Sequence, residues 1–186
     1  YLQEIRKDML KNLEYFLPPD PMLGLPVVPE GFAPQSNEDP LVRYEINLLV
    51  DNSKTKGVPV IVEDHPTVSN LLGCVEREAE MGALVTDFTL IKAGSLLRAN
   101  KGYLILHMED LLETQYQSAW EGLLRALRTG EAKIEDAGES ADQARTKTIE
   151  PDPVPLDLKV VLIGTDEVYE LLAAHDDRFS KLFKIK

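Results

Sequence analysis

Polar side chains follow two short apolar runs of the sequence, at positions suited to chemistry on a phosphate. Glu109 and Asp110 come soon after the run Tyr103–Leu106. Thr165 comes soon after a second run, Val160–Ile163. Carboxylate oxygens bind magnesium, and a hydroxyl at the end of a buried strand can orient water or a phosphate. The pattern therefore indicates phosphate-transfer chemistry, provided that the two runs are neighbouring strands.

Each candidate residue also has an ordinary structural explanation, and the residue types alone leave both open. Acidic residues are favoured in the first turn of a helix, which would account for Glu109 and Asp110. Thr165 can equally cap the helix that follows it. Arg178, in "HDDRFSKLFKIK", either forms a local salt bridge or reaches the nucleotide of a neighbouring subunit. His107 is a polar strand-end residue or a vestige of an acidic site.

The sequence lacks the loop that holds a triphosphate. That loop has the pattern G-x-x-x-x-G-K-[ST], which no segment matches, and "SKTKG" at residues 53–57 has no preceding glycine frame. No serine has a convincing partner for nucleophilic catalysis, and the histidines show no metal-ligand spacing. We therefore expect neither a complete ATP site nor catalytic residues nor a metal site in this chain.

Composition narrows the class of protein. The chain has 186 residues, of which 44% are hydrophobic, and a formal charge of −12, so it can form one substantial domain. The negative charge disfavours nucleic acids and anionic membranes as partners. No apolar stretch approaches the roughly 20 residues of a membrane helix. The single cysteine, Cys74, excludes an internal disulfide and is typical of a reducing compartment, so we expect a cytoplasmic protein.

Hydrophobic periodicity predicts three regions: a helix over residues 1–17, a proline-rich linker over 18–40 and an α/β domain over 41–186. The apolar residues of the first region recur at steps of three and four, as on one face of a core helix or of a coiled coil. These residues are Leu2, Ile5, Met9, Leu13 and Phe16.

Within residues 41–186, two nearly all-apolar strands are predicted, each leading into a helix. This pattern is typical of a three-layer α/β fold, in which polar strand tips meet at one edge of a parallel sheet. The first helix lies around residues 116–129 and is closed by Gly130, and the second covers 166–175. Further strands are expected within 41–52, within 57–64 with Pro59 at a sheet edge, and at Thr86–Ile91.

Other segments carry weaker signals. Residues 66–78 are ambiguous between helix and strand. "AGSLLRAN" is expected to be a short helix with Ser95 as its cap. "EAKIED" and "TKTIEP" could pair as a hairpin across the intervening polar loop.

Three long segments together resemble the AAA+ portion of Lon-related ATP-dependent proteases, most closely the bacterial Lon-like proteins with a divergent ATPase part. The segments are "MGALVTDFTLIKAGSLLRANKGYLIL", "SAWEGLLRALRTGEAKIE" and "PVPLDLKVVLIGTDEVYELLAAHDDRFSKLFKIK". "RYEINLLVDNS" and "VEDHPTVSNLLG" also resemble that branch. The similarity covers residues 41–186, and the preceding helix suits the helical insertion that such proteins carry. It implies a partial P-loop-NTPase-like (AAA+) core.

The resemblance implies roles for individual positions. Residues 103–106 would form the Walker B strand, where Lys101 replaces the first of two usual glycines and His107 stands where an acid is common. Glu109 and Asp110 remain candidate acids of the nucleotide site. Thr165 would be at the sensor-1 position. Arg178 would be the arginine finger.

The resemblance also implies a function for a longer parent protein. The loop around residues 81–88, with Met81, Gly82 and Phe88, would face a central pore and grip substrate polypeptide. The phosphate loop is expected upstream of Tyr1 and a Ser-Lys peptidase domain beyond Lys186. The parent would be a homo-oligomeric, ATP- and magnesium-dependent serine endopeptidase acting on protein substrates, of which this segment alone is inactive.

Two other functions fit the sequence. A degenerate AAA+ scaffold would assemble the ring and admit substrate without hydrolysing ATP, and His107 and Lys101 favour it. An acidic interaction module unrelated to proteases is the third possibility, and it predicts no downstream peptidase domain.

Overall fold

The computed structural model of the chain divides into two compact units, residues 1–46 and 47–186, and each is described by itself. The residues described are 2–16, 41–80, 83–113, 116–134 and 149–184. The predicted linker, residues 18–40, therefore lies outside the described residues.

The described residues of the first unit include an amphipathic helix, α1 (Leu2–Lys11), shorter than the helix expected over residues 1–17. It ends where both the backbone N–H and the side-chain amide of Asn12 donate to the Asp8 carbonyl, at 3.1 and 2.9 Å. Asparagine competes in this way with regular helical bonding. A 3-10 turn follows at Leu13–Tyr15. The hydroxyl of Tyr44 donates to the Asp8 carboxylate at 2.9 Å and holds the returning chain against α1.

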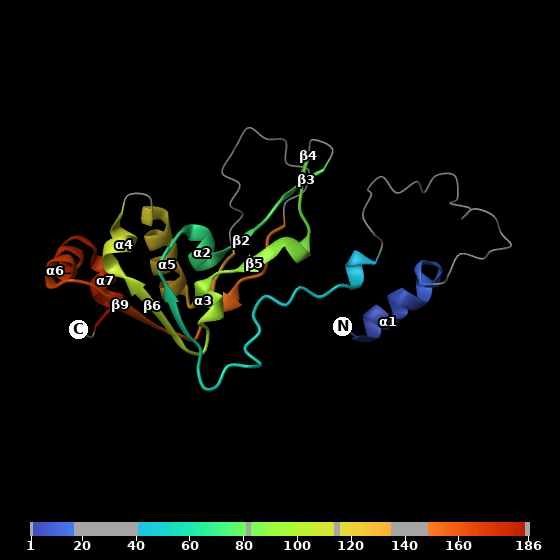
Figure 1. Ribbon diagram of the computed structural model, residues 1–186, viewed down its shortest axis with the longest axis horizontal. Helices are drawn as coiled ribbons and strands as arrows, with labels where there is room; N and C mark the ends of the chain where they lie inside the picture. The colour runs from blue at the N-terminus through green and yellow to red at the C-terminus, as the bar shows by residue number, and fades with distance from the viewer. Residues whose placement is uncertain (1, 17–40, 81–82, 114–115, 135–148, 185–186) are drawn as a thin grey trace. The chain divides into compact units, whose positions relative to one another are not determined.

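The second unit is built on a three-stranded parallel sheet in the order β1-β6-β9 (Figure 1). The strands are β1 (Val60–Glu63), β6 (Tyr103–His107) and β9 (Lys159–Ile163). The apolar strand β6 is central, as predicted, and Pro59 precedes the edge strand β1, where no inward N–H is needed. The predicted α/β class is confirmed.

Helices cover one face of this sheet. The strand order follows the sequence in a single direction, and right-handed crossovers that advance in one direction lie on the same face. Leu104 and Leu106 point to this face and are completely buried in the main core, which includes Trp120 and Phe179. The helices are α2 (Val68–Leu72), α3 (Ser95–Arg98), α4 (Met108–Leu112), α5 (Gln117–Thr129), α6 (Asp166–His175) and α7 (Asp177–Leu182).

The opposite face of the sheet is apolar and exposed among the described residues. Its side chains come from alternating positions of all three strands, and Val60 and Val62 are 56% and 52% exposed. Val161 and Ile163 of β9 are 41% and 46% exposed. A sheet face of this composition is normally covered by a second layer.

A β-hairpin arm extends from the second unit between β1 and α3 (Figure 1). At its base, an added Cβ on Gly94 would collide with the Gly73 backbone nitrogen, and one on Gly73 would collide with the Lys92 carbonyl at 2.5 Å. The antiparallel pairs are β2 (Gly73–Val75) with β5 (Ile91–Ala93), and β3 (Glu78–Glu80) with β4 (Ala83–Val85). The ambiguous segment 66–78 thus contains a helix followed by strands.

The strand expected at Thr86–Ile91 is wrong. Asp87 accepts the Thr89 N–H at 2.6 Å and starts a 3-10 turn, Phe88–Leu90, between β4 and β5. An aspartate that bonds its own backbone two residues on favours a turn over a ladder.

The strand expected within residues 41–52 is also wrong. Val42–Tyr44 form a 3-10 turn, and the extended residues after them pair with no described strand. The Asn47 amide instead donates to the carbonyls of Phe88 and Ile91, at 2.8 and 2.9 Å. A side chain thus replaces the ladder, and Ile46 and Leu48 stay exposed.

Two further expectations need correction. Ser95 does not cap α3, because Gly94 occupies the cap position. Ser95 is instead buried, and its hydroxyl bonds to the Glu63 carboxylate and the Asn70 carbonyl. The partner of β7 (Glu131–Ala132) is β8 (Val154–Pro155) rather than residues 146–151.

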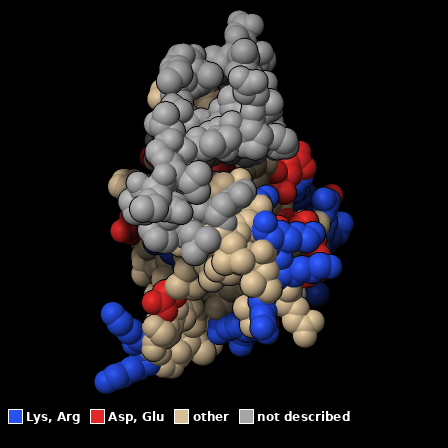
Figure 2. Space-filling model, turned by 90° about the vertical axis from the view of Figure 1, so that its right-hand side faces the viewer, with Lys and Arg blue, Asp and Glu red and all other residues tan. Residues whose placement is uncertain are grey.

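Surface charge is mixed in spite of the net −12. On the face that Figure 2 shows, Lys and Arg side chains form several groups with Asp and Glu among them. No helix within the described part of the chain has the length and apolar character needed to span a bilayer.

Candidate functional site

The two polar strand tips lie side by side. β6 and β9 are neighbouring parallel strands, with His107 in register with Ile163. Beyond them, the Thr165 backbone N–H donates to Glu109 Oε1 at 3.0 Å. Gly164 permits this approach, because an added Cβ there would lie only 3.0 Å from Met108 Cβ. The sequence-based expectation that the tips converge is confirmed.

The Glu109 carboxylate is held by its own backbone N–H, at the start of α4, and by the backbone N–H of Thr165. Its own N–H, followed by that of Thr165, holds the pKa of the Glu109 carboxyl below its usual range. The geometry therefore matches the helix-start explanation of this acid, while Asp110 is half-buried beside it. Among the described residues, no three His, Cys, Asp or Glu side chains are grouped as a metal ion would require. A role for the two acids in binding magnesium stays a prediction.

Thr165 is the N-cap of α6. Its hydroxyl accepts the Val168 N–H at 3.4 Å, which satisfies one of the free donors of the first turn. The side chain remains exposed at the strand tip, so capping and a role toward a phosphate are compatible.

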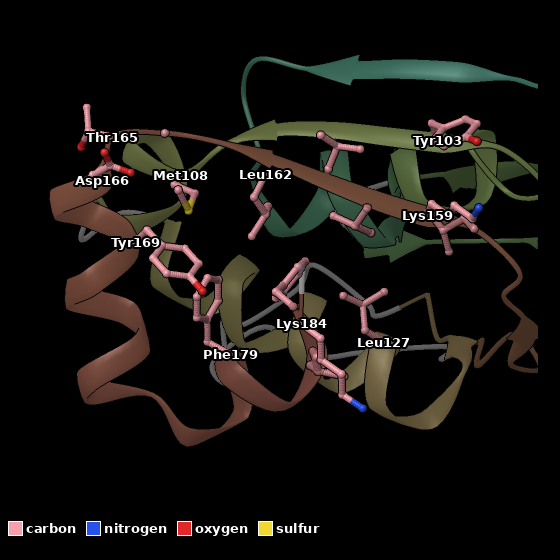
Figure 3. A pocket seen from close by; sticks show the side chains of 16 residues that line it. Tyr103, Met108, Leu127, Lys159, Leu162, Thr165, Asp166, Tyr169, Phe179 and Lys184 are labelled. Carbon is pink, nitrogen blue, oxygen red and sulfur yellow. The ribbon is translucent and has the colours of Figure 1, made fainter. Parts of the chain in front are cut away.

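A groove of about 710 Å³ runs along the edge of β9 that no described strand pairs (Figure 3). Thr165 and Asp166 lie at one end of it, and Tyr103 and Lys159 lie at the other, with Lys184 and Leu127 below them in this view. Its walls are largely apolar, with Leu162 of the sheet facing Tyr169 and Phe179 of the helices. A groove of this size has the dimensions of a small-molecule site.

Arg178 is held by two carboxylates. Its guanidinium donates to both Glu121 oxygens, at 2.6 and 2.9 Å, and to both Asp176 oxygens, at 2.9 Å each. These bonds to Arg178 hold the pKa values of Glu121 and Asp176 below their usual range. The local salt bridge is therefore present in the structure. An arginine-finger role would require Arg178 to leave or share these partners, and it stays a prediction.

The expected pore loop coincides with the hairpin arm. Met81 and Gly82, between β3 and β4, lie outside the described residues. Phe88 is half-buried in the 3-10 turn, with its carbonyl bound by Asn47. Substrate contact by this arm stays a prediction.

Sequence reasoning did not identify two partners that define these sites. Glu121 lies 57 residues from Arg178 in sequence and gives no local signal of the contact. The cluster in which buried Ser95 and exposed Arg98 both bond Glu63 was likewise missed, although Glu63 lies in a predicted strand. Only the packing of α5 against α7, and of α3 against β1, brings these groups together.

Comparison with known proteins gives a family and a distant structural likeness. No curated protein matches the chain. Among solved structures, NtrX from Brucella abortus in complex with ADP matches with 18% sequence identity and a TM-score of 0.41. The match covers 69% of this chain and 24% of that one, so the chain spans about a quarter of its length.

The family comparison covers most of the chain. The model of the family described as "LonB-like, AAA domain" matches residues 56–186, from just before β1 to the end of the chain. This range contains the sheet, the hairpin arm and the strand tips that carry Glu109 and Thr165. The chain therefore belongs to the LonB-like AAA domain family.

Proposed function

We propose that this chain is the AAA+ segment of a Lon-like ATP-dependent serine protease. In the parent, it would bind ATP with magnesium at the strand tips and take part in a homo-oligomeric cytoplasmic ring. The ring would pass protein substrates to a peptidase domain. The arm at residues 73–93 would contact the substrate.

The observation that carries this proposal is the contact between Glu109 and Thr165. It joins the ends of β6 and β9 at 3.0 Å, in a chain of an AAA family. In open α/β sheets, ligands bind outside the carboxyl ends of the strands. A phosphate at this edge would meet the Thr165 hydroxyl and the positive end of the α6 dipole.

We also propose that a further strand completes the site, beside the edge of β9 that no described strand pairs. Ligands bind where the strand order reverses direction, and β1, β6 and β9 follow one another without a reversal. A strand beside β9 would create that reversal and lie along the groove in Figure 3. A phosphate loop at the end of this strand would face Thr165 directly.

A non-hydrolysing scaffold is the second candidate, and one observation favours it. His107 occupies the strand end, and Glu109 is already bonded to two backbone N–H groups. Neither side chain is then a ready ligand for magnesium. Such a ring would bind nucleotide without turnover.

Nucleotide binding by the full-length parent tests the proposal through Thr165. Thr165→Asp keeps an excellent helix cap but places a negative charge beside the phosphates. We expect at least a tenfold loss of ATP affinity, measured by titration calorimetry, with unchanged thermal unfolding. Thr165→Ser, which keeps both hydroxyl and cap, should bind like the wild type.

Turnover then separates the two candidates. ATP hydrolysis and degradation of an unfolded protein substrate, measured on the same parent, should both occur if the segment is a motor. Nucleotide binding without hydrolysis would support the scaffold. Unchanged ATP affinity in Thr165→Asp would refute a nucleotide site at these strand tips.

A further inference from the structure

A second pocket lies on the surface between α5 and α7, and it includes none of the strand-tip residues. It has a volume of about 260 Å³. On α5, Glu121, Arg125 and Arg128 recur at steps of four and three and so share one helix face. On α7, Arg178 and Lys181 are three residues apart and face them. We call this the α5–α7 basic pocket.

The charge of the α5–α7 basic pocket is opposite to that of the chain. Four cationic side chains and one carboxylate line it, although the chain as a whole carries −12. The dipole of each helix favours a basic residue in its last turn, which accounts for Arg128 and Lys181 separately. It does not account for the two helices directing these cations into one pocket.

Arg178 is fixed within the pocket, whereas the other three cations, Arg125, Arg128 and Lys181, are exposed. Glu121 and Asp176 occupy the Arg178 guanidinium. Arg128 and Lys181 are exposed, and no described acidic side chain forms an ion pair with either. An incoming anion would therefore meet Arg128 and Lys181, while Arg178 positions α7.

The size, lining and charge of the pocket indicate which class of anion fits it. At about 260 Å³ it is smaller than the roughly 300–1,000 Å³ typical of sites for whole cofactors. Buried Leu124 contributes an apolar floor beneath the cations. Glu121 already forms a two-oxygen bond to Arg178 here, so a carboxylate fits the local geometry. The net charge of −12 repels long polyanions.

We propose that the α5–α7 basic pocket binds a short acidic segment of a partner polypeptide. Carboxylates of the segment pair with Arg128 and Lys181, and an adjacent apolar side chain contacts Leu124. Glu121, whose carboxylate bonds Arg178 in the same pocket, repels the carboxylates of the segment. Loss of its charge therefore strengthens binding.

Peptide titration of the 186-residue chain, followed by two-dimensional amide NMR, tests this proposal. The probes are the capped peptide acetyl-EDLE-amide and its neutral counterpart acetyl-QNLQ-amide. We expect the acidic peptide to shift resonances of α5 and α7, and the neutral peptide to have no effect. Raising the salt concentration from 50 to 300 mM should weaken binding, because exposed ion pairs are screened.

Charge-matched variants locate the site. The double variant Arg128→Gln with Lys181→Gln should bind the acidic peptide about tenfold more weakly, because each lost exposed charge contact weakens binding about threefold. The control, Lys54→Gln with Lys56→Gln, changes net charge equally in an exposed loop and should bind like the wild type.

Removing the charge of Glu121 provides a test in the opposite direction. Glu121→Gln should raise affinity about threefold, the effect of one exposed charge contact. Glu150→Gln, an equal change of charge at another exposed position, should leave affinity unchanged.

Three results would overturn the proposal. The first is equal binding of the acidic and neutral peptides. The second is equal loss of affinity in the pocket variant and the loop variant. The third is tighter binding of inorganic triphosphate than of the acidic peptide at the same resonances, which would assign the pocket to phosphate.

Discussion

Glycine at position 101 should make the chain more stable than alanine does at the same position. Lys101 has a φ of 68°, in the left-handed region, and is the only described non-glycine residue with positive φ. Its backbone N–H donates to the Asp157 carbonyl at 2.8 Å, and the next residue, Gly102, packs against the Pro59 carbonyl. The turn into β6 thus imposes this conformation on a residue that does not favour it.

The expected magnitude follows from comparing glycine with alanine at this position. A left-handed conformation costs an L-residue about 1–2 kcal/mol. Glycine avoids this cost, but it loses more chain entropy on folding than alanine does, which offsets about 0.5–1 kcal/mol of the advantage. Lys101→Gly should therefore be more stable than Lys101→Ala by about 0.5–1 kcal/mol.

The lysine side chain contributes little to this balance. Its ammonium group pairs with Asp157 at 3.0 Å, but the two side chains are 74% and 78% exposed. Such a pair contributes about 0–1 kcal/mol. Because both variants lose the pair equally, the glycine–alanine comparison isolates the backbone effect.

Urea unfolding followed by circular dichroism measures the difference. For a chain of this size, the expected gap between the variants corresponds to roughly 1–4 °C in melting temperature. Lys101→Asn should fall between them, because asparagine tolerates the left-handed region better than alanine. An alanine variant as stable as the glycine variant would show that the turn relaxes and would refute the reasoning.

Two further predictions concern the base of the arm and the Arg178 cluster. Gly94→Ala should destabilise the chain by about 2 kcal/mol or more, because the added methyl collides with the Leu71 carbonyl. The control Gly57→Ala meets open space and should cost only about 1 kcal/mol, through its positive φ. Equal losses of stability in thermal unfolding would contradict the close packing at Gly94. Asp176 has a lowered pKa because Arg178 donates to its carboxylate. The stabilisation of the fold by this ion pair is therefore complete above the ordinary pKa of aspartate and is lost as pH falls through the lowered pKa. The unfolding free energy of Asp176→Asn, which keeps the helix cap, should therefore fall less than that of the wild type between pH 6 and pH 3, and parallel curves would argue against the ion pair.

Local patterns predicted the elements whose stability depends on their own periodicity. The apolar runs that became β6 and β9, the stripe that became α5 and the glycine that ends α5 at φ 72° were all readable in sequence. Alternation failed within residues 41–52, because an extended segment becomes a strand only if a partner pairs with it. There the Asn47 side chain took the place of that partner.

The strand tips show what residue types predict about the site and what they do not. The sequence alone determined that Glu109 and Thr165 follow apolar strands, and parallel pairing then required their tips to meet. Tertiary structure alone decided what each side chain bonds: Thr165 N–H to Glu109, and Arg178 to Glu121 across 57 residues of chain. Periodicity reflects the backbone geometry of one element, whereas such contacts depend on how separate elements pack, which no short stretch of sequence encodes.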